Sequence, residues 1–151
     1  MKDPSDDIRD WIYTVLNNNV VYNTAAVPIY SFPPENVSYP YIVIGEQSGE
    51  GEDGAKDRWL WDVTTQIHVY TQHWGTDASY VPVNTIVSAC WQRLRTLDTP
   101  DSYATDEDTV ALANFALIKV RIGSFNTERI LNDNEIIISK QFSINLLVEE
   151  E

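Results

Sequence analysis

Cysteine and basic residues are scarce in this 151-residue sequence, and each scarcity excludes a class of protein. The single cysteine, Cys90, cannot form an internal disulfide, so a cytosolic origin is the simplest expectation. Ten Lys and Arg stand against 23 Asp and Glu, which gives a net charge of −13. Proteins that bind nucleic acid or anionic membranes concentrate Lys and Arg on one face, whereas these basic residues are scattered. The composition therefore argues against direct, affinity-driven binding of DNA or membranes.

Long apolar runs are absent as well. No run reaches the about 18 residues of a membrane-spanning helix, and the acidic segment Met1–Asp10 does not have the pattern of a secretory signal. We therefore expect neither a spanning helix nor a signal peptide. What the sequence does contain is 43% hydrophobic residues, with five Trp and eight Tyr. This composition is typical of a globular protein with a packed core.

Two amphipathic helices are predicted. Asp3 is placed to cap the first, Pro4 suits its first position, and the acidic residues at 6 and 7 complement the positive end of the helix dipole. The asparagines at 17–19 end this helix, and the second is predicted over Ser79–Leu97. The apolar stripe of the first helix comprises Ile8, Trp11, Ile12, Val15 and Leu16, and that of the second comprises Val83, Ile86, Val87, Cys90, Leu94 and Leu97.

Five segments have the character of strands, either as short apolar runs or as alternating patterns. They are Val27–Tyr30, Tyr39–Glu46, Arg58–Tyr70, Leu112–Ile122 and Glu135–Val148. A turn at residues 132–134 joins the last two. The acidic segment Gly49–Gly54 has no side chains that build a core, so we expect it to be a mobile loop.

The order helix, three strands, helix, two strands predicts an α+β fold. We expect a single domain over residues 1–151, with a mainly antiparallel sheet of about five strands and two helices packed on one face. An acidic surface crossover is expected at residues 98–109, and a long C-terminal hairpin at residues 112–148. The sequence contains no internal repeat and no linker to a second domain.

No pattern of catalytic, metal-binding or phosphate-binding residues is complete. His68 and His73 have opposite parity along one strand, so they cannot easily share a metal. Cys90 lies in an apolar stripe, where a free cysteine acts as a small hydrophobe rather than a nucleophile. The carboxylates between Glu46 and Asp57 fail the calcium-loop pattern, which leaves a solvated loop or a weak cation site. Neither a glycine-rich phosphate loop nor a nucleophile elbow occurs, so we expect no enzyme activity and no cofactor.

The aromatic residues of the long strand are the strongest functional signal. Trp59 and Trp61 point the same way, which fits core packing or a protein–protein interface, because Trp, Tyr and Arg are enriched at interface hot spots. A strand of this length also invites pairing if its edge is exposed. The predicted interface between copies of the chain comprises Glu50, Glu52, Asp53, Arg58, Trp59, Trp61, Asp62 and Trp74.

Several segments resemble a known family. They are residues 27–30 (VPIY), the prolines at 33–34, residues 39–46 (YPYIVIGE), residues 67–75 (IHVYTQHWG) and residues 86–94 (IVSACWQRL). Together they are similar to the tail-completion proteins of tailed bacteriophages. The similarity covers roughly Ile8–Leu97. Because the matching residues have structural roles, the similarity is more specific for the fold than for the function.

The resemblance implies a non-enzymatic structural virion protein, a tail terminator or head–tail connector at the neck or the head-proximal end of the tail. It implies a homo-oligomeric ring, hexameric or dodecameric, that joins head to tail around the DNA channel and assembles in the host cytoplasm. Its partners would be portal, connector and tail proteins of the same virion, with DNA only as passing cargo and no membrane. The negative charge agrees, because a cationic wall would bind DNA by counterion release. The alternative is a soluble acidic protein-binding or inhibitory module, and an enzyme is the least favoured class.

Overall fold

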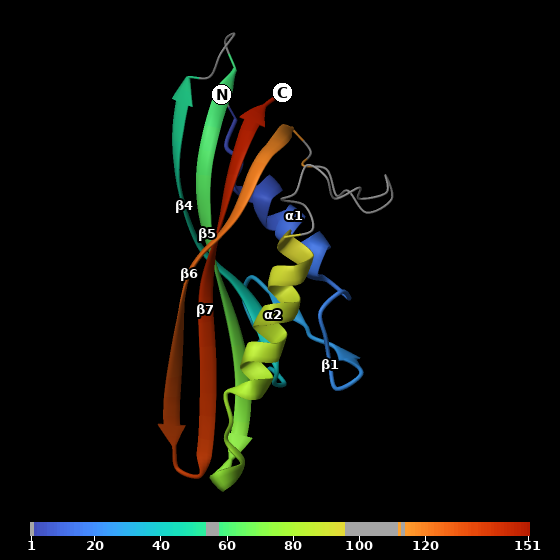
Figure 1. The fold of residues 1–151 in the computed structure, drawn as a ribbon, viewed down its shortest axis with the longest axis vertical. Coiled ribbons are helices and arrows are strands. Elements are labelled where there is room, and N and C mark those ends of the chain that lie inside the picture. The colour runs from blue at the N-terminus through green and yellow to red at the C-terminus, as the bar shows by residue number, and fades with distance from the viewer. Residues whose placement is uncertain (1, 54–57, 96–111, 113) are drawn as a thin grey trace.

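The computed structural model describes residues 2–53, 58–95, 112 and 114–151 (Figure 1). A five-stranded sheet in the order β3-β4-β5-β7-β6 dominates this part of the chain, and a separate two-stranded sheet pairs β1 with β2. The elements are α1 (Ser5–Leu16), β1 (Val21–Tyr22), β2 (Ala25–Ala26), β3 (Ile29–Tyr30), β4 (Tyr41–Asp53), β5 (Trp59–Trp74), a 3-10 turn (Gly75–Asp77), α2 (Val81–Arg95), β6 (Phe115–Asn132) and β7 (Glu135–Glu150).

The α+β class is confirmed, with two helices on one side of a mainly antiparallel sheet (Figure 1). Only the short pair β3–β4 is parallel. The small β1–β2 ribbon between α1 and β3 is an addition that the sequence pattern did not predict. Its residues at positive φ, Asn23 and Thr24, make the tight turn that joins the two strands.

The core lies between the helices and the middle of the sheet. The predicted apolar stripe of α1 is buried, and so is that of α2 as far as Leu94. On the sheet, alternate residues of three neighbouring strands complete the core, because successive side chains in a strand point to opposite faces. Fully buried examples are Ile42, Ile67, Phe142, Ile144 and Leu146.

The start of each helix differs from the prediction by one or two residues. In α1 the cap is Pro4 rather than Asp3, and the Asp3 carboxylate instead accepts a bond from the Ser5 backbone N–H at 2.9 Å. In α2 the helix begins at Val81, whose N–H donates to the Ser79 hydroxyl at 3.2 Å. A side chain that accepts a hydrogen bond from a nearby backbone N–H favours a position just before the helix over one in its first turn.

The predicted loop at residues 49–54 is wrong over residues 49–53, which form the last part of β4. Gly49 pairs with Val63 and Gly51 with Trp61 in the ladder to β5. A Cβ on Gly51 would overlap the Trp59 ring, so the absence of side chains here makes room for the indoles of the partner strand. The apolar surface needed to order this segment comes from β5, which the local sequence of β4 does not reveal. Residue 54 lies outside the described part of the chain.

The long strand does not have the exposed edge on which its predicted pairing with another copy depends. β5 is the central strand, paired with β4 on one side and with β7 on the other along most of its length. It extends beyond Tyr70 to Trp74 because β7 supplies partners for these residues as well. The free edges of the sheet belong to other strands.

The β6–β7 hairpin is longer than predicted, and it turns at Asp133, which has φ of 51°. Lys140, which interrupts the apolar pattern of β7, is buried on the helix-covered face. Its ammonium donates to the Asn84 side chain on α2 at 2.8 Å and lies 4.5 Å from the centre of the Phe125 ring. A buried cation with these partners is compatible with the core. The predicted acidic crossover at residues 98–109 lies outside the described residues.

Candidate functional site

The structure brings most of the predicted interface residues together at one end of the β4–β5 ladder. We call residues 48–53 and 58–63 the β4–β5 end. Here Glu50 pairs with Asp62, and Asp53 pairs with Trp59. Trp74 does not belong to this cluster, because it terminates β5 at the other end of the sheet.

The two faces of the β4–β5 end differ in chemistry. Trp59 and Trp61 lie on the helix-covered side, with ring centres 6.2 Å apart, and Trp61 packs against the core. Their indole N–H groups are buried without an acceptor among the described residues. Glu50 and Asp62 lie on the opposite side, because residues next to one another in a strand alternate between faces. Asp53 pairs with Trp59 and lies on the tryptophan side, so the predicted set divides into a mainly apolar surface and an acidic one.

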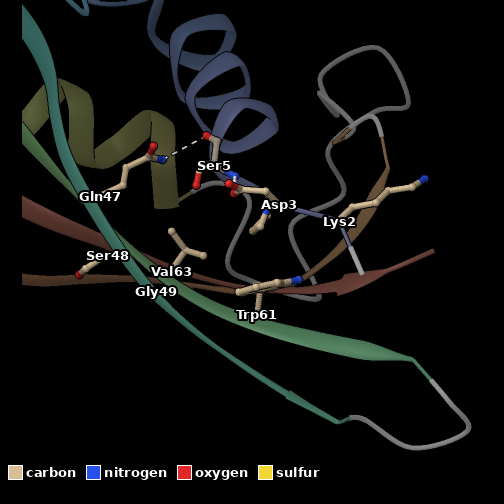
Figure 2. Close-up of a pocket in the computed structure, with 9 residues that line it drawn as sticks. Lys2, Asp3, Ser5, Gln47, Ser48, Gly49, Trp61 and Val63 are labelled. Atoms are coloured by element: carbon tan, nitrogen blue, oxygen red, sulfur yellow. Dashed lines mark hydrogen bonds between the residues drawn. The ribbon is translucent and has the colours of Figure 1, made fainter.

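A cavity of about 420 Å³ lies beside Trp61 on the helix-covered side. Figure 2 shows the N-terminal residues Lys2 to Ser5 across from Trp61 and Val63, with Gln47 at the helix end of the opening. The lining is Lys2, Asp3, Pro4, Ser5, Gln47, Ser48, Gly49, Trp61 and Val63. Hydrogen bonds to Ser5 lower the pKa of the Asp3 carboxyl. This cavity combines an indole wall with a polar rim, an arrangement that suits the docking of an apolar group.

Arg9 and Gln47 fix the mouth of this cavity, and the sequence did not single them out. The Arg9 guanidinium donates to the Gln47 side-chain oxygen at 2.9 Å, to the Ile44 carbonyl at 2.9 Å and to the Gly45 carbonyl. Gln47 in turn donates to the Ser5 carbonyl and to the Thr65 hydroxyl, each at 3.2 Å. These bonds tie α1 to the bulge in β4. The only sequence signal was a lone arginine on the polar side of an amphipathic helix.

The opposite face of the β4–β5 end is a shallow polar groove of about 380 Å³. Its lining is Ser48, Gly49, Glu50, Asp62, Thr64 and Asn145. Asn145 donates from its amide to the Asp62 carboxylate and, at 3.1 Å, to the Thr64 hydroxyl. Glu50 and Asp62 are cross-strand partners of like charge, an arrangement that destabilises a sheet when no cation is near.

Arg58 makes the one ion pair found in the described residues of this region, with Glu149 at 3.3 Å. The Arg58 side chain is 60% exposed, and such surface pairs contribute little to stability. The same exposure leaves this arginine accessible to a neighbouring molecule.

The histidines and the cysteine, the candidates for metal binding or catalysis in the sequence, lie apart from one another in the structure. His68 lies on the open face of β5 beside Tyr70, whereas His73 lies on the other face, with Nε2 3.0 Å from the Thr71 hydroxyl. Burial lowers the pKa of His68 and raises that of the Cys90 thiol to about 12. Within the residues that the structure describes, no cluster of His, Cys, Asp and Glu has the arrangement of a metal site. Nor is any of the described helices long and apolar enough to cross a membrane.

A second exposed apolar region was missed by sequence reasoning. The far end of the β6–β7 hairpin extends past the helices (Figure 1) and, together with the end of β5, leaves several large hydrophobic side chains in solvent. These are Trp74, Phe125, Ile130 and Leu131. Ile130 and Leu131 are adjacent in β6 and point to opposite faces, so they follow no one-sided alternation that would have predicted this region.

Comparison with known proteins finds a similar fold in a solved structure. No protein-family model matches the chain, and no curated protein matches it in sequence. Among solved structures, a chain of the virion of a native gene transfer agent particle matches with a TM-score of 0.58 and 13% identity. The match covers 97% of this chain and 91% of that chain. At this level of identity the two chains share their fold.

Proposed function

We propose that this chain is a non-enzymatic structural protein of a virion, and that it forms a ring at the neck or the head-proximal end of a phage-type tail. The observation that carries the proposal is the structural match to a chain of a gene transfer agent virion, over nearly the whole length of both chains. The resemblance of residues 8–97 to tail-completion proteins supports the same role. As a tail terminator or head–tail connector, the ring joins head to tail and surrounds the DNA channel.

The β4–β5 end is the proposed contact surface between subunits. It presents Trp59 and Trp61 beside a cavity of about 420 Å³ on one face, and acidic side chains with the exposed Arg58 on the other. Hot spots at interfaces are rich in Trp and Arg, and an apolar cavity with a polar rim accepts such anchors from a neighbour. Portal, connector or tail proteins of the same virion are the proposed partners above and below the ring.

The net charge of −13 is compatible with such a ring. Six copies carry 6 × −13 = −78, but at physiological ionic strength charges farther apart than about 8 Å are largely screened. Apolar burial at about 25 cal/mol per Å² then favours association. An acidic wall also lets DNA pass, because it offers no cations to replace the counterions of the phosphates.

The alternative function is a soluble acidic protein-binding module, which the cavity beside Trp61 would also serve. Native mass spectrometry at physiological ionic strength separates the two. A ring component should assemble into a closed oligomer of six or twelve copies, alone or on the portal or tail-tube protein. A chain that stays monomeric alone and with both neighbours would contradict the ring.

A double variant tests the contact surface itself. Trp59→Ser with Trp61→Ser should remain folded by circular dichroism at reduced stability, and should lose the oligomer. Phe32→Ser is the matched control, because Phe32 is 92% exposed and far from this end in sequence. A folded double variant that still assembles normally would remove the β4–β5 end from the interface.

A further inference from the structure

The five-stranded sheet has two free edges in the described structure. β6 pairs only with β7, so its outer edge is open along its length. On the other side, β3 covers only Ile42 and Val43 of β4, and Arg9 occupies the carbonyls of residues 44 and 45. Beyond that point none of the described strands lies at the outer edge of the segment Ser48–Asp53. Open edges are templates for pairing with another chain.

The two edges carry opposite charge at the same level of the sheet. Following the ladder from strand to strand, Glu50 pairs with Asp62, Asp62 with Leu147, and Leu147 with Lys119. The next row on the same face runs from Ser48 through Thr64 and Asn145 to Arg121. The first row therefore begins at an acidic residue and ends at a basic one, whereas the second begins at an uncharged serine and ends at a basic residue.

The charged side chains at both ends are available to a neighbour. Glu50, Glu52, Lys119 and Arg121 are exposed, and none of them forms an ion pair among the described residues. Arg121 makes one weak contact, from its guanidinium to the Asn145 side-chain oxygen at 3.4 Å. Glu50 meanwhile faces the like-charged Asp62 across the ladder. A cation placed beyond the edge of β4 would relieve this repulsion.

The directions of the strands also fit. Along β4, β5, β7 and β6 each strand is antiparallel to the next. A second copy placed beside the first without inversion therefore presents its β6 antiparallel to β4, which continues the alternation. Bulges in β6 after Leu117 and after Ile122 bound a regular stretch of this edge, residues 119–122, where both basic side chains lie, and a second regular stretch follows from Phe125. Bulges restrict the register that an edge accepts.

We propose that the outer edge of β4 at residues 48–53 pairs with the outer edge of β6 at residues 119–122 in the next copy of this chain, with Lys119 and Arg121 beside Glu50 and Glu52. This inference rests on the proposed ring, and it identifies the β6 edge as the surface that the β4–β5 end of the neighbouring copy contacts. Pairing β4 with β4, or β6 with β6, would bring like charges together. The contact is therefore head-to-tail, and such contacts form rings when the rotation between copies closes.

Mixed single-cysteine variants test this pairing. Glu50→Cys and Lys119→Cys proteins, or Glu50→Cys and Arg121→Cys proteins, are mixed under mild oxidation in conditions where the wild type assembles. A disulfide requires Cα atoms about 4.4–6.8 Å apart, so crosslinked heterodimers should form in at least one mixture. Neither variant should crosslink on its own through these positions. The native Cys90 is fully buried and does not interfere.

Glu128→Cys is the matched control, because Glu128 is exposed on the same strand and face but lies lower in the ladder, opposite Ser139. Mixed with Glu50→Cys, it should give no heterodimer. Wild-type oligomers by native mass spectrometry with no crosslink in either test mixture would overturn the edge pairing and leave the proposed ring intact. A wild type that forms no oligomer, alone or with its virion neighbours, would overturn both.

Charge reversal provides an independent readout. Glu50→Lys alone and Lys119→Glu alone should each weaken assembly, whereas a mixture of the two chains should assemble in alternation, because each β4 edge then meets a β6 edge of opposite charge. The chain that carries both reversals should regain assembly, because its two edges are again complementary. Loss of assembly in the double-reversal chain to the level of the worse single variant would contradict the proposed pairing.

Discussion

Phe125 and Phe142 face each other across one hairpin, yet Phe142 is fully buried and Phe125 is 60% exposed. The pair marks the boundary between two regions of the molecule. In the middle of the sheet, α1 and α2 cover one face and bury its apolar residues. Toward the far end of the hairpin the strands continue beyond the helices (Figure 1). Large side chains there, such as Leu131, lie in solvent.

The comparison separates residues that hold the fold from residues that are available for assembly. In the middle of the sheet the helices cover the apolar side chains, whereas Phe125 and Leu131, on the same face of the hairpin, lie in solvent. Apolar groups that a single copy leaves exposed, together with uncovered strand edges, are the surfaces that a partner buries.

The largest expected effect comes from the phenylalanine pair itself. Phe142→Ala removes a fully buried ring, so the free energy of unfolding should fall by about 3–5 kcal/mol. Phe125→Ala should lower it by about 1 kcal/mol or less, through lost contacts with Trp91 and Lys140. Urea titration followed by circular dichroism gives both values. Equal decreases in the free energy of unfolding would contradict the distinction between the covered and the uncovered region.

A tryptophan pair on β5 should show a smaller difference. Trp61 packs against the core, so Trp61→Ala should lower the free energy of unfolding by about 2 kcal/mol. Trp74 is 60% exposed at the other end of the strand, and Trp74→Ala should change it by about 0.5 kcal/mol or less. Chemical denaturation monitored by circular dichroism avoids the change in fluorescence. A larger loss from Trp74→Ala would show that the far end contributes to the fold of the single copy.

Gly51→Ala should reveal how tightly the indoles pack on β4. The new methyl group would overlap the Trp59 ring and lie 3.0 Å from Trp61 Cζ3. Displacement of these rings should lower the free energy of unfolding by about 1 kcal/mol and shift the tryptophan emission. Ser48→Ala, at an exposed position of the same strand, is the control and should leave both unchanged. Unchanged emission in Gly51→Ala would mean that the indoles do not lie over this glycine.

The smallest effect concerns pH and the half-buried His68 on the open face. Burial lowers its pKa below the ordinary 6.5, and the Glu46 carboxylate opposes this shift. The unfolded chain then binds the proton more readily, so the full stability is present above pH 6.5 and declines as the pH falls through the folded-state pKa. Urea titrations between pH 7 and 5 should show less decline for His68→Gln than for the wild type. If the free energy of unfolding fell equally with pH in both proteins, His68 would not contribute to the pH dependence of stability.

Sequence periodicity was sufficient to predict the helix and strand faces that pack into the core. The stripe from Ile8 to Leu16 predicted a buried helix face, and the alternation after Arg58 predicted one buried face of a strand. Periodicity could not reveal that β5 is central, because edge and centre differ in hydrogen-bond partners rather than in side-chain pattern. Periodicity also could not predict that Gly49–Asp53 forms a strand. The apolar contacts of this segment come from Trp59, Trp61 and Val63 on the neighbouring strand.

The candidate surface was predictable only in part. The tryptophans and carboxylates were recognised from composition, but their division between two faces follows from the register of β4 on β5, which a bulge after Ile44 resets. The basic side chains of Lys119 and Arg121 received no role, because their level on the sheet relative to Glu50 depends on three successive strand pairings. Such long-range pairings are not encoded in any local segment.

Cryo-electron microscopy of purified virions that contain this protein tests the central claim most directly. The account predicts a closed ring of copies of this chain around the DNA channel at the junction of head and tail, with β4 of each copy beside β6 of the next. A particle in which the chain lies elsewhere, or contributes isolated copies without a ring, would contradict it.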